Sequence, residues 1–331
     1  MTTAESLFQA FLNRHDDAAW AEVLDRLTPS IHPVDRRAVG IWFAFFPLRL
    51  HNALATASDP SAMARALSLA GKYRLADQVD SSHEFLYGHR YWPEVKREVN
   101  SYLSGSPASL KLDDQIVESA TRTSKRINAD VSLLVGITAV AFMTLQQAGP
   151  DVFSRTAEAR SYGARWKKSP DQIVAGRIRD AGQGLFGFLR TIDKRFTVTF
   201  REYEPGSTFE VINDQELTTA SARDQRDYRL QDQRCIEGPI PVECRTAACG
   251  TCWVGILSDT RRLSEPTPRE VRKMADFGYS GFTGDGSSPI RLACQTRSHG
   301  NVSIVIPPWN GLLERLDEQS QPPNPIEETN Q

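Results

Sequence analysis

The spacing of apolar residues changes once along the chain, near Phe196. Before that point, segments such as 6–13 and 18–27 place apolar residues three and four positions apart, which is the period of an amphipathic helix. From Phe196, apolar and polar residues alternate along 196–200, and they do so again along 302–306. Alternation of this kind is the period of a strand that buries one face. The sequence therefore predicts an α+β protein in which an all-helical part precedes a sheet.

Length and local charge divide the chain further. At about 150 residues a domain, 331 residues correspond to two domains. We place an all-helical domain of unassigned role at 1–150 and a sheet domain at 195–310. Between them, 151–194 contains nine Lys and Arg against five Asp and Glu, so we expect a basic, glycine-containing linker. The last segment, 311–331, holds one basic and five acidic residues and three prolines, and we expect a disordered acidic tail.

Global composition excludes several classes of protein. The 39 basic and 41 acidic residues leave a formal net charge of -2, so no strong field favours nucleic acid, and we expect no nucleic-acid partner. The apolar stretches 38–47 and 131–145 are shorter than the roughly 20 residues that span a bilayer, so we expect buried helices, with peripheral membrane association left open. The first thirty residues lack a basic stretch that leads into an apolar run, which favours a cytoplasmic location.

Five cysteines lie close together in the second half of the chain. An odd number of thiols in a reducing compartment favours a metal or cluster site over a disulfide framework. Cys244, Cys249 and Cys252 follow C-x4-C-x2-C in the string CRTAACGTC, and 41 residues separate Cys252 from Cys294 in RLACQTR. This is the plant-type spacing for a 2Fe-2S cluster. Two ferric ions bridged by sulfides take soft anionic thiolates, two on each iron.

Small residues lie between these cysteines. Ala247, Ala248, Gly250 and Thr251 let the backbone fold closely around an inorganic core and direct N–H groups at the sulfurs. Such hydrogen bonds stabilise the additional negative charge after reduction and so help to set the reduction potential.

Residues from about 195 to 308 resemble the 2Fe-2S ferredoxins of the plant and adrenodoxin type. The resemblance is carried by CxxxxCGTC and the later RLACQ, and it covers about a third of the chain. It implies a β-grasp fold that holds one 2Fe-2S cluster. It further implies that Cys244 and Cys249 hold the iron nearer the surface, that Cys252 and Cys294 hold the inner iron, and that Arg245 lies on the loop rim.

The sequence departs from this family at two places. Ala247 stands where the family often has glycine, and we expect it to adopt a conformation that does not need a positive φ. The connection between Val211 and Cys244 is longer than usual, and its middle, 222–234 (ARDQRDYRLQDQR), is highly charged, so we expect an exposed helical insertion. Further on, Thr267 to Glu270 reads as a capping box that begins a short helix ending near Gly278.

Other patterns favour less specific interpretations. Four cysteines could also bind zinc, but structural zinc sites usually pair two C-x2-C hairpins and this chain has one. Cys235 lies outside the motif, and we expect a buried or idle thiol. The string GQGLFG at 182–187 matches G-x-G-x-x-G, but a helical pattern precedes it where a dinucleotide fingerprint needs a strand, so we interpret it as a hinge.

The histidines are weak candidates for cofactor ligands. His83 and His89 flank an aromatic segment, but an interval of six residues does not place both on one helix face. We therefore expect hydrogen-bonded or exposed side chains, not ligands of a haem. His299 follows Cys294 closely, but four cysteines already complete a ligand set.

Together these patterns predict a one-electron carrier that works between a reductase and an acceptor and docks through its helical domain. We identify no nucleophile, acid–base pair or flavin motif, so we do not expect an autonomous enzyme. Two alternatives remain open: an iron-sulfur subunit of a larger oxidoreductase or monooxygenase complex, and a redox sensor in which the cluster controls partner binding.

Overall fold

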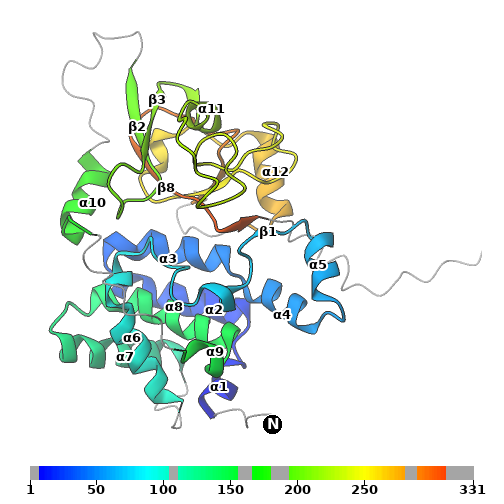
Figure 1. The fold of residues 1–331 in the computed structure, drawn as a ribbon. Coiled ribbons are helices and arrows are strands. Elements are labelled where there is room, and N and C mark those ends of the chain that lie inside the picture. The colour runs from blue at the N-terminus through cyan, green and yellow to red at the C-terminus, as the bar shows by residue number, and fades with distance from the viewer. Residues whose placement is uncertain (1–6, 104–110, 156–165, 180–193, 280–288, 311–331) are drawn as a thin grey trace, which may run out of the picture.

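The computed structural model describes residues 7–103, 111–155, 166–179, 194–279 and 289–310. Within these ranges, helices dominate as far as Arg179 and a mixed sheet follows, which confirms the α+β prediction (Figure 1). The predicted hinge at 182–187 and the predicted acidic tail lie outside the described residues.

Some helices of the first half begin or end at recognisable capping residues. Asp16 accepts a hydrogen bond from the backbone N–H of Ala19 and starts α2, while Gly149, at φ 77°, ends α8. The left-handed φ of 52° at Asn128 ends α7, and α8 packs against α7. The elements are α1 (Leu7–Leu12), α2 (Asp17–Leu27), η1 (Thr28–Ser30), α3 (Pro33–Phe45), α4 (Leu48–Thr56), α5 (Pro60–Ala66), β1 (Ala70–Gly71), η2 (Leu75–Gln78), η3 (Tyr87–Tyr91), α6 (Trp92–Tyr102), α7 (Leu112–Ile127), α8 (Ser132–Ala148), α9 (Pro150–Phe153) and α10 (Pro170–Arg179).

One apolar stretch, Pro33–Thr56, is longer than the sequence patterns suggested. It has 24 residues, and its most apolar 18-residue window has a mean hydropathy of 1.2, so by length and composition alone it could cross a membrane. The stretch is divided between α3 and α4 at Phe46 and Pro47, and 56% of its apolar window is buried inside the fold. Because core helices pass the same test, this stretch is weak support for a membrane span.

The second half is built on a five-stranded sheet in the order β3-β2-β8-β5-β6. β2 and β8 are parallel, and the other neighbours are antiparallel. The strands predicted along 196–200 and 302–306 and the helix after Thr267 are confirmed to within about two residues. Thr267 accepts the Glu270 N–H at 3.2 Å, as a capping box requires. The elements are β2 (Arg195–Thr199), β3 (Thr208–Ile212), β4 (Gln215–Glu216), α11 (Leu217–Ser221), β5 (Trp253–Ile256), η6 (Thr260–Arg262), α12 (Pro268–Asp276), β6 (Ile290–Leu292), β7 (Arg297–Ser298), β8 (Val302–Val305) and β9 (Trp309–Asn310).

The charged segment 222–234 contains turns and no helix, so the prediction of a helical insertion was wrong. Aspartates hold these turns: Asp224 and Asp232 each accept the backbone N–H of the arginine two positions later and also bind its guanidinium. A side chain that bonds its own backbone two residues on offers an alternative to the helix, and this competition explains the difference.

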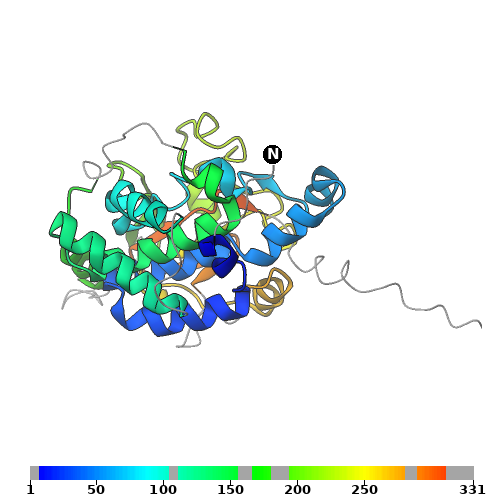
Figure 2. The same cartoon turned by 90° about the horizontal axis from the view of Figure 1, so that it is seen from below.

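The two halves share one hydrophobic core. α3 lies directly against β5, where a Cβ added at Gly255 would come within 2.6 Å of the Ile41 side chain. In Figure 1 the sheet lies above α3 and α8, and in Figure 2, seen from below, the blue-to-green helices lie in front of the yellow and orange C-terminal segments. Part of the predicted linker forms α10, whose Arg177 binds both Glu202 and the carbonyl of Val34. The predicted domain boundaries themselves stay a prediction.

Candidate metal centre

The loop that carries the first three cysteines has an alternating backbone. Arg245, Ala247 and Gly250 have φ values of 51°, 61° and 69°, separated by residues with negative φ. Such an alternation turns successive N–H groups toward one point and forms an anion-binding nest. The N–H groups of Thr246, Ala248 and Cys249 accordingly donate to the Cys244 sulfur at 3.4, 3.3 and 3.3 Å.

The expectation that Ala247 avoids a positive φ was wrong. A non-glycine residue in the left-handed region costs about 1–2 kcal/mol. The loop gains contacts in exchange, because the Ala247 methyl group is buried and its backbone N–H stabilises the Cys294 thiolate. The nest therefore holds its shape with alanine where the family often has glycine.

Strand pairing brings the remote cysteine to the loop. Cys252 directly precedes β5, and Cys294 lies two residues after the end of β6. The two strands are antiparallel with Trp253 opposite Leu292, and the N–H of Ala293 donates to the Cys252 carbonyl at 2.9 Å. Cys252 and Cys294 therefore lie at the same end of this strand pair.

The four thiols form two pairs with unequal exposure. Cys244 and Cys249 interact with each other at the partly exposed side of the loop, and Cys252 and Cys294 interact in the interior, where both are at most 3% exposed. Arg245 lies on the exposed rim and pairs with Glu237. This grouping is the one that the family resemblance implies, and which sulfurs share an iron stays a prediction.

The surroundings favour thiolates at two of these positions. Burial acts to raise the pKa of Cys244, but the N–H groups of Thr246 and Cys249 outweigh it and lower this pKa to about 6. The hydrogen bond with Cys252 lowers the pKa of Cys294 to about 7, whereas the same bond together with burial raises that of Cys252 well above its usual range. Since the thiolate is the metal ligand, the site is prepared for cations and would release protons as they bind.

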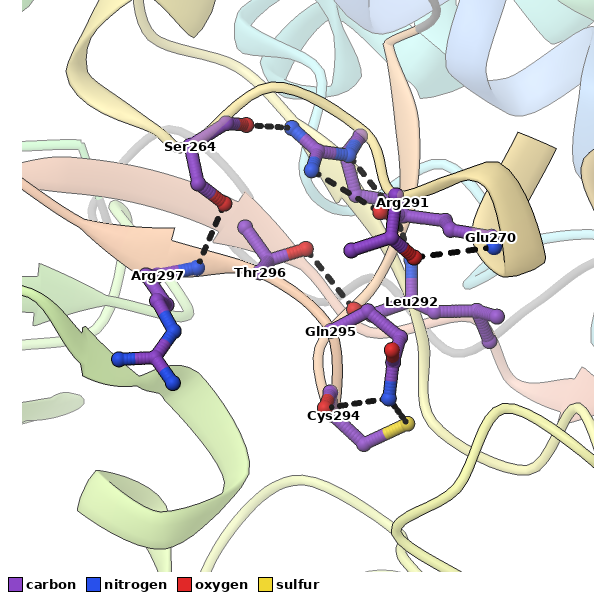
Figure 3. Close-up of polar contacts among 9 residues, drawn as sticks. Ser264, Glu270, Arg291, Leu292, Cys294, Gln295, Thr296 and Arg297 are labelled. Atoms are coloured by element: carbon purple, nitrogen blue, oxygen red, sulfur yellow. Dashed lines mark hydrogen bonds and ion pairs between the residues drawn. The ribbon is translucent and has the colours of Figure 1, made fainter.

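Two side chains donate to the sulfurs. The Thr251 hydroxyl, which has one proton to donate, lies 3.1 Å from the Cys249 sulfur and 3.3 Å from the Glu243 carboxylate. The Gln295 amide donates to the Cys294 sulfur at 3.5 Å and to the Cys294 carbonyl at 2.8 Å (Figure 3). Sequence reasoning named Thr251 and missed Gln295, although a polar residue directly after the last cysteine was visible in the string RLACQ.

A buried ion pair beside Cys294 was also missed. The guanidinium of Arg291 donates to both oxygens of Glu270 at 2.8 and 3.0 Å, and both side chains are almost completely buried (Figure 3). Glu270 also accepts the backbone N–H of Leu292, and the Leu292 carbonyl accepts the backbone N–H of Gln295. The pair thus connects α12, β6 and the turn that carries Cys294.

Cys235 lies apart from this arrangement. It is a buried thiol, as expected, and it donates to the Pro239 carbonyl at 3.1 Å. Burial raises the pKa of Cys235 to about 12, so it stays protonated at neutral pH.

His83 and His89 meet, because no continuous α-helix joins them. The Nδ1 atoms of His83 and His89 are 2.7 Å apart, and His83 also bonds the Val79 carbonyl. Burial lowers the pKa of His83 to about 3, so this ring is neutral. The expectation of hydrogen-bonded histidines is confirmed, while the argument from a helix face did not apply.

Across the described ranges, no three His, Cys, Asp or Glu side chains converge on one point as ligands of a single ion would. A diiron centre does not need such a group, since each iron takes two thiolates and two bridging sulfides. Two thiol pairs with inward N–H donors fit this requirement.

Residues 210–299 match the family model of the 2Fe-2S iron-sulfur cluster binding domain. The matched range contains all four cysteines of the loop and the β6 turn. Residues 210–299 of this chain are therefore a 2Fe-2S iron-sulfur cluster binding domain. No solved structure matches the chain.

Proposed function

We propose that this protein carries single electrons between a reductase and an acceptor through one 2Fe-2S cluster held by Cys244, Cys249, Cys252 and Cys294. The observation that carries the proposal is the pairing of these thiols, one pair partly exposed and one buried, inside the matched domain. When bound, a 2Fe-2S cluster accepts and releases one electron at a time.

The chain's own groups have distinct parts in this function. The nest N–H groups and the Thr251 and Gln295 side chains offset negative charge at the sulfurs, which favours the reduced state. The buried position of Cys252 and Cys294 excludes water from the inner side. The exposed residues Thr246 and Ala248 leave the outer side accessible to a partner protein.

Serine substitutions test the ligand set. We expect Cys252→Ser to lose most of its bound iron and the paramagnetic signal after dithionite reduction, because a serine hydroxyl is a poor ligand beside soft thiolates. The matched control is Cys235→Ser, another buried thiol, which should keep iron content and signal close to those of the unmodified protein. Iron and sulfide analysis with electron paramagnetic resonance measures both. Full iron content and an unchanged signal in Cys252→Ser would contradict the assignment.

We further propose that the helical half docks the carrier onto its redox partner. The shared core supports this idea, since a protein bound to the helical half would be held at a fixed place relative to the cysteine loop. Val117 in α7 and Val131 just before α8 are apolar side chains of this half that are 37% and 38% exposed.

Placing a carboxylate on the helical half, or on the other half as a control, tests whether the helical half docks the redox partner. With the full-length protein as bait, we expect Val117→Glu or Val131→Glu to lower the amount of redox partner retained by about tenfold. The reason is that burying a carboxylate at an interface costs free energy. Leu230→Glu, at a 93% exposed position of the other half, is the control. A captured protein counts only if it exchanges electrons with the bait. Equal retention by all three variants would place docking elsewhere.

A further inference from the structure

The short strand β9 contacts both halves of the protein at once. It pairs antiparallel with β1 of the helical half, with Gly71 opposite Trp309 and Ala70 opposite Asn310. The Trp309 indole N–H donates to the Phe45 carbonyl at the end of α3 at 2.6 Å. In the other direction, the Asn310 amide donates to the Thr251 carbonyl in the cysteine loop at 2.8 Å.

The path of the chain into β9 is closely constrained. The Pro308 carbonyl accepts the N–H of Lys72 at 2.7 Å, and the Pro307 carbonyl accepts from Arg234 at the same distance. Gly71 has a φ of 87°, and a Cβ at this position would lie 2.5 Å from the Pro308 carbonyl oxygen. Only glycine permits this approach, so the register of β9 depends on a residue of the helical half.

Thr251 connects β9 to the cysteine sulfurs, because it contacts both. Its carbonyl is held by Asn310, its hydroxyl donates to the Cys249 sulfur, and its peptide bond leads directly into Cys252. Asn310 is only 5% exposed, so water does not easily replace this hydrogen bond. Fixing the Thr251 carbonyl fixes the orientation of the peptide unit and limits the motion of the hydroxyl.

We propose that β9 is a positioning strand through which the helical half sets the redox properties of the cysteine loop, with Asn310 as its positioning residue. The inference rests on the proposed cluster. Without the bond from Asn310, the Thr251 peptide is free to rotate and its hydroxyl donates less often to Cys249. A thiolate with fewer donors stabilises the reduced state less, so the reduction potential becomes more negative.

The test compares two variants from opposite halves with one control. Asn310→Leu keeps the approximate size of the side chain and removes the donor, whereas Gly71→Ala displaces β9 from the helical half. Gly149→Ala is the control, because this glycine also lies in the helical half at a positive φ of 77° but has nothing within 4 Å of an added Cβ. We expect Asn310→Leu and Gly71→Ala to shift the one-electron equilibrium with a viologen mediator about threefold to tenfold toward oxidised protein, the worth of one hydrogen bond.

Three readouts distinguish the outcomes. Mediated redox titration gives the shift, the g-values of the dithionite-reduced protein report the loop geometry, and hydrogen exchange of the Thr251 and Cys252 amides reports loop motion. Shifted potentials and faster exchange in both variants, but not in Gly149→Ala, support the proposal. Iron-loaded variants that match Gly149→Ala in all three readouts overturn it. If either variant fails to fold, Trp309→Phe, which removes the donor to Phe45 and makes this buried side chain smaller, decides by the same criteria. An unmodified protein without iron would instead overturn the proposed function.

Discussion

Arg291→Met is expected to lower the free energy of unfolding by about 3–5 kcal/mol, because it leaves the Glu270 carboxylate buried without its cation. Glu270 also accepts the backbone N–H of Leu292. When the Glu270 side chain reorganises after the loss of Arg291, we expect the turn that carries Cys294 to move with it. We therefore also expect a large fall in retained iron. Urea unfolding with analysis of bound iron measures both effects.

The control for this experiment is an ion pair on the surface. Arg195 and Glu210 lie across β2 and β3 with side chains that are 64% and 69% exposed. Arg195→Met should change stability by less than about 1 kcal/mol, since solvent screens such pairs. If Arg291→Met proved as stable as Arg195→Met and kept its iron, the buried pair would not support the Cys294 turn.

Gly250→Ala is expected to have a comparable effect through steric conflict. Gly250 lies between Cys249 and Cys252 at a φ of 69°, and an added Cβ would lie 2.1 Å from the Phe277 ring. The left-handed conformation costs about 1–2 kcal/mol for alanine, and overpacking adds about 1–3 kcal/mol. We expect a loss of about 2–5 kcal/mol in unfolding free energy and reduced iron binding, because the loop must move away from Phe277.

A second glycine separates the two contributions. Gly206 has a φ of 82° with nothing within 4 Å of an added Cβ, so Gly206→Ala measures the conformational cost alone. Combining Gly250→Ala with Phe277→Leu should recover part of the lost iron binding, since the smaller side chain leaves room for the methyl group. Equal destabilisation by Gly250→Ala and Gly206→Ala would show that the Phe277 ring moves aside without a measurable loss of unfolding free energy.

Local patterns predicted the elements that depend on neighbours in the sequence. The change of period near Phe196 separated helices from strands, and the Thr267 capping box lies where the structure has it. The predicted helix at 222–234 failed because three Asp-x-Arg turns compete with helical hydrogen bonding. That signal was present in the sequence, but composition alone does not show it.

The spacing of the cysteines determined the class of site, because three thiolates on one short loop and one distant thiolate suit a diiron centre wherever the loop is placed. Only the tertiary structure decided what supports that loop. The positive φ of Ala247, the buried pair of Glu270 and Arg291, and the bond from Asn310 to Thr251 all depend on which distant segments pack together. Contacts between residues that are 21 and 59 positions apart leave no period or motif in the chain. The sequence therefore predicted the ligand set, and the packing of distant segments determined how the loop is held.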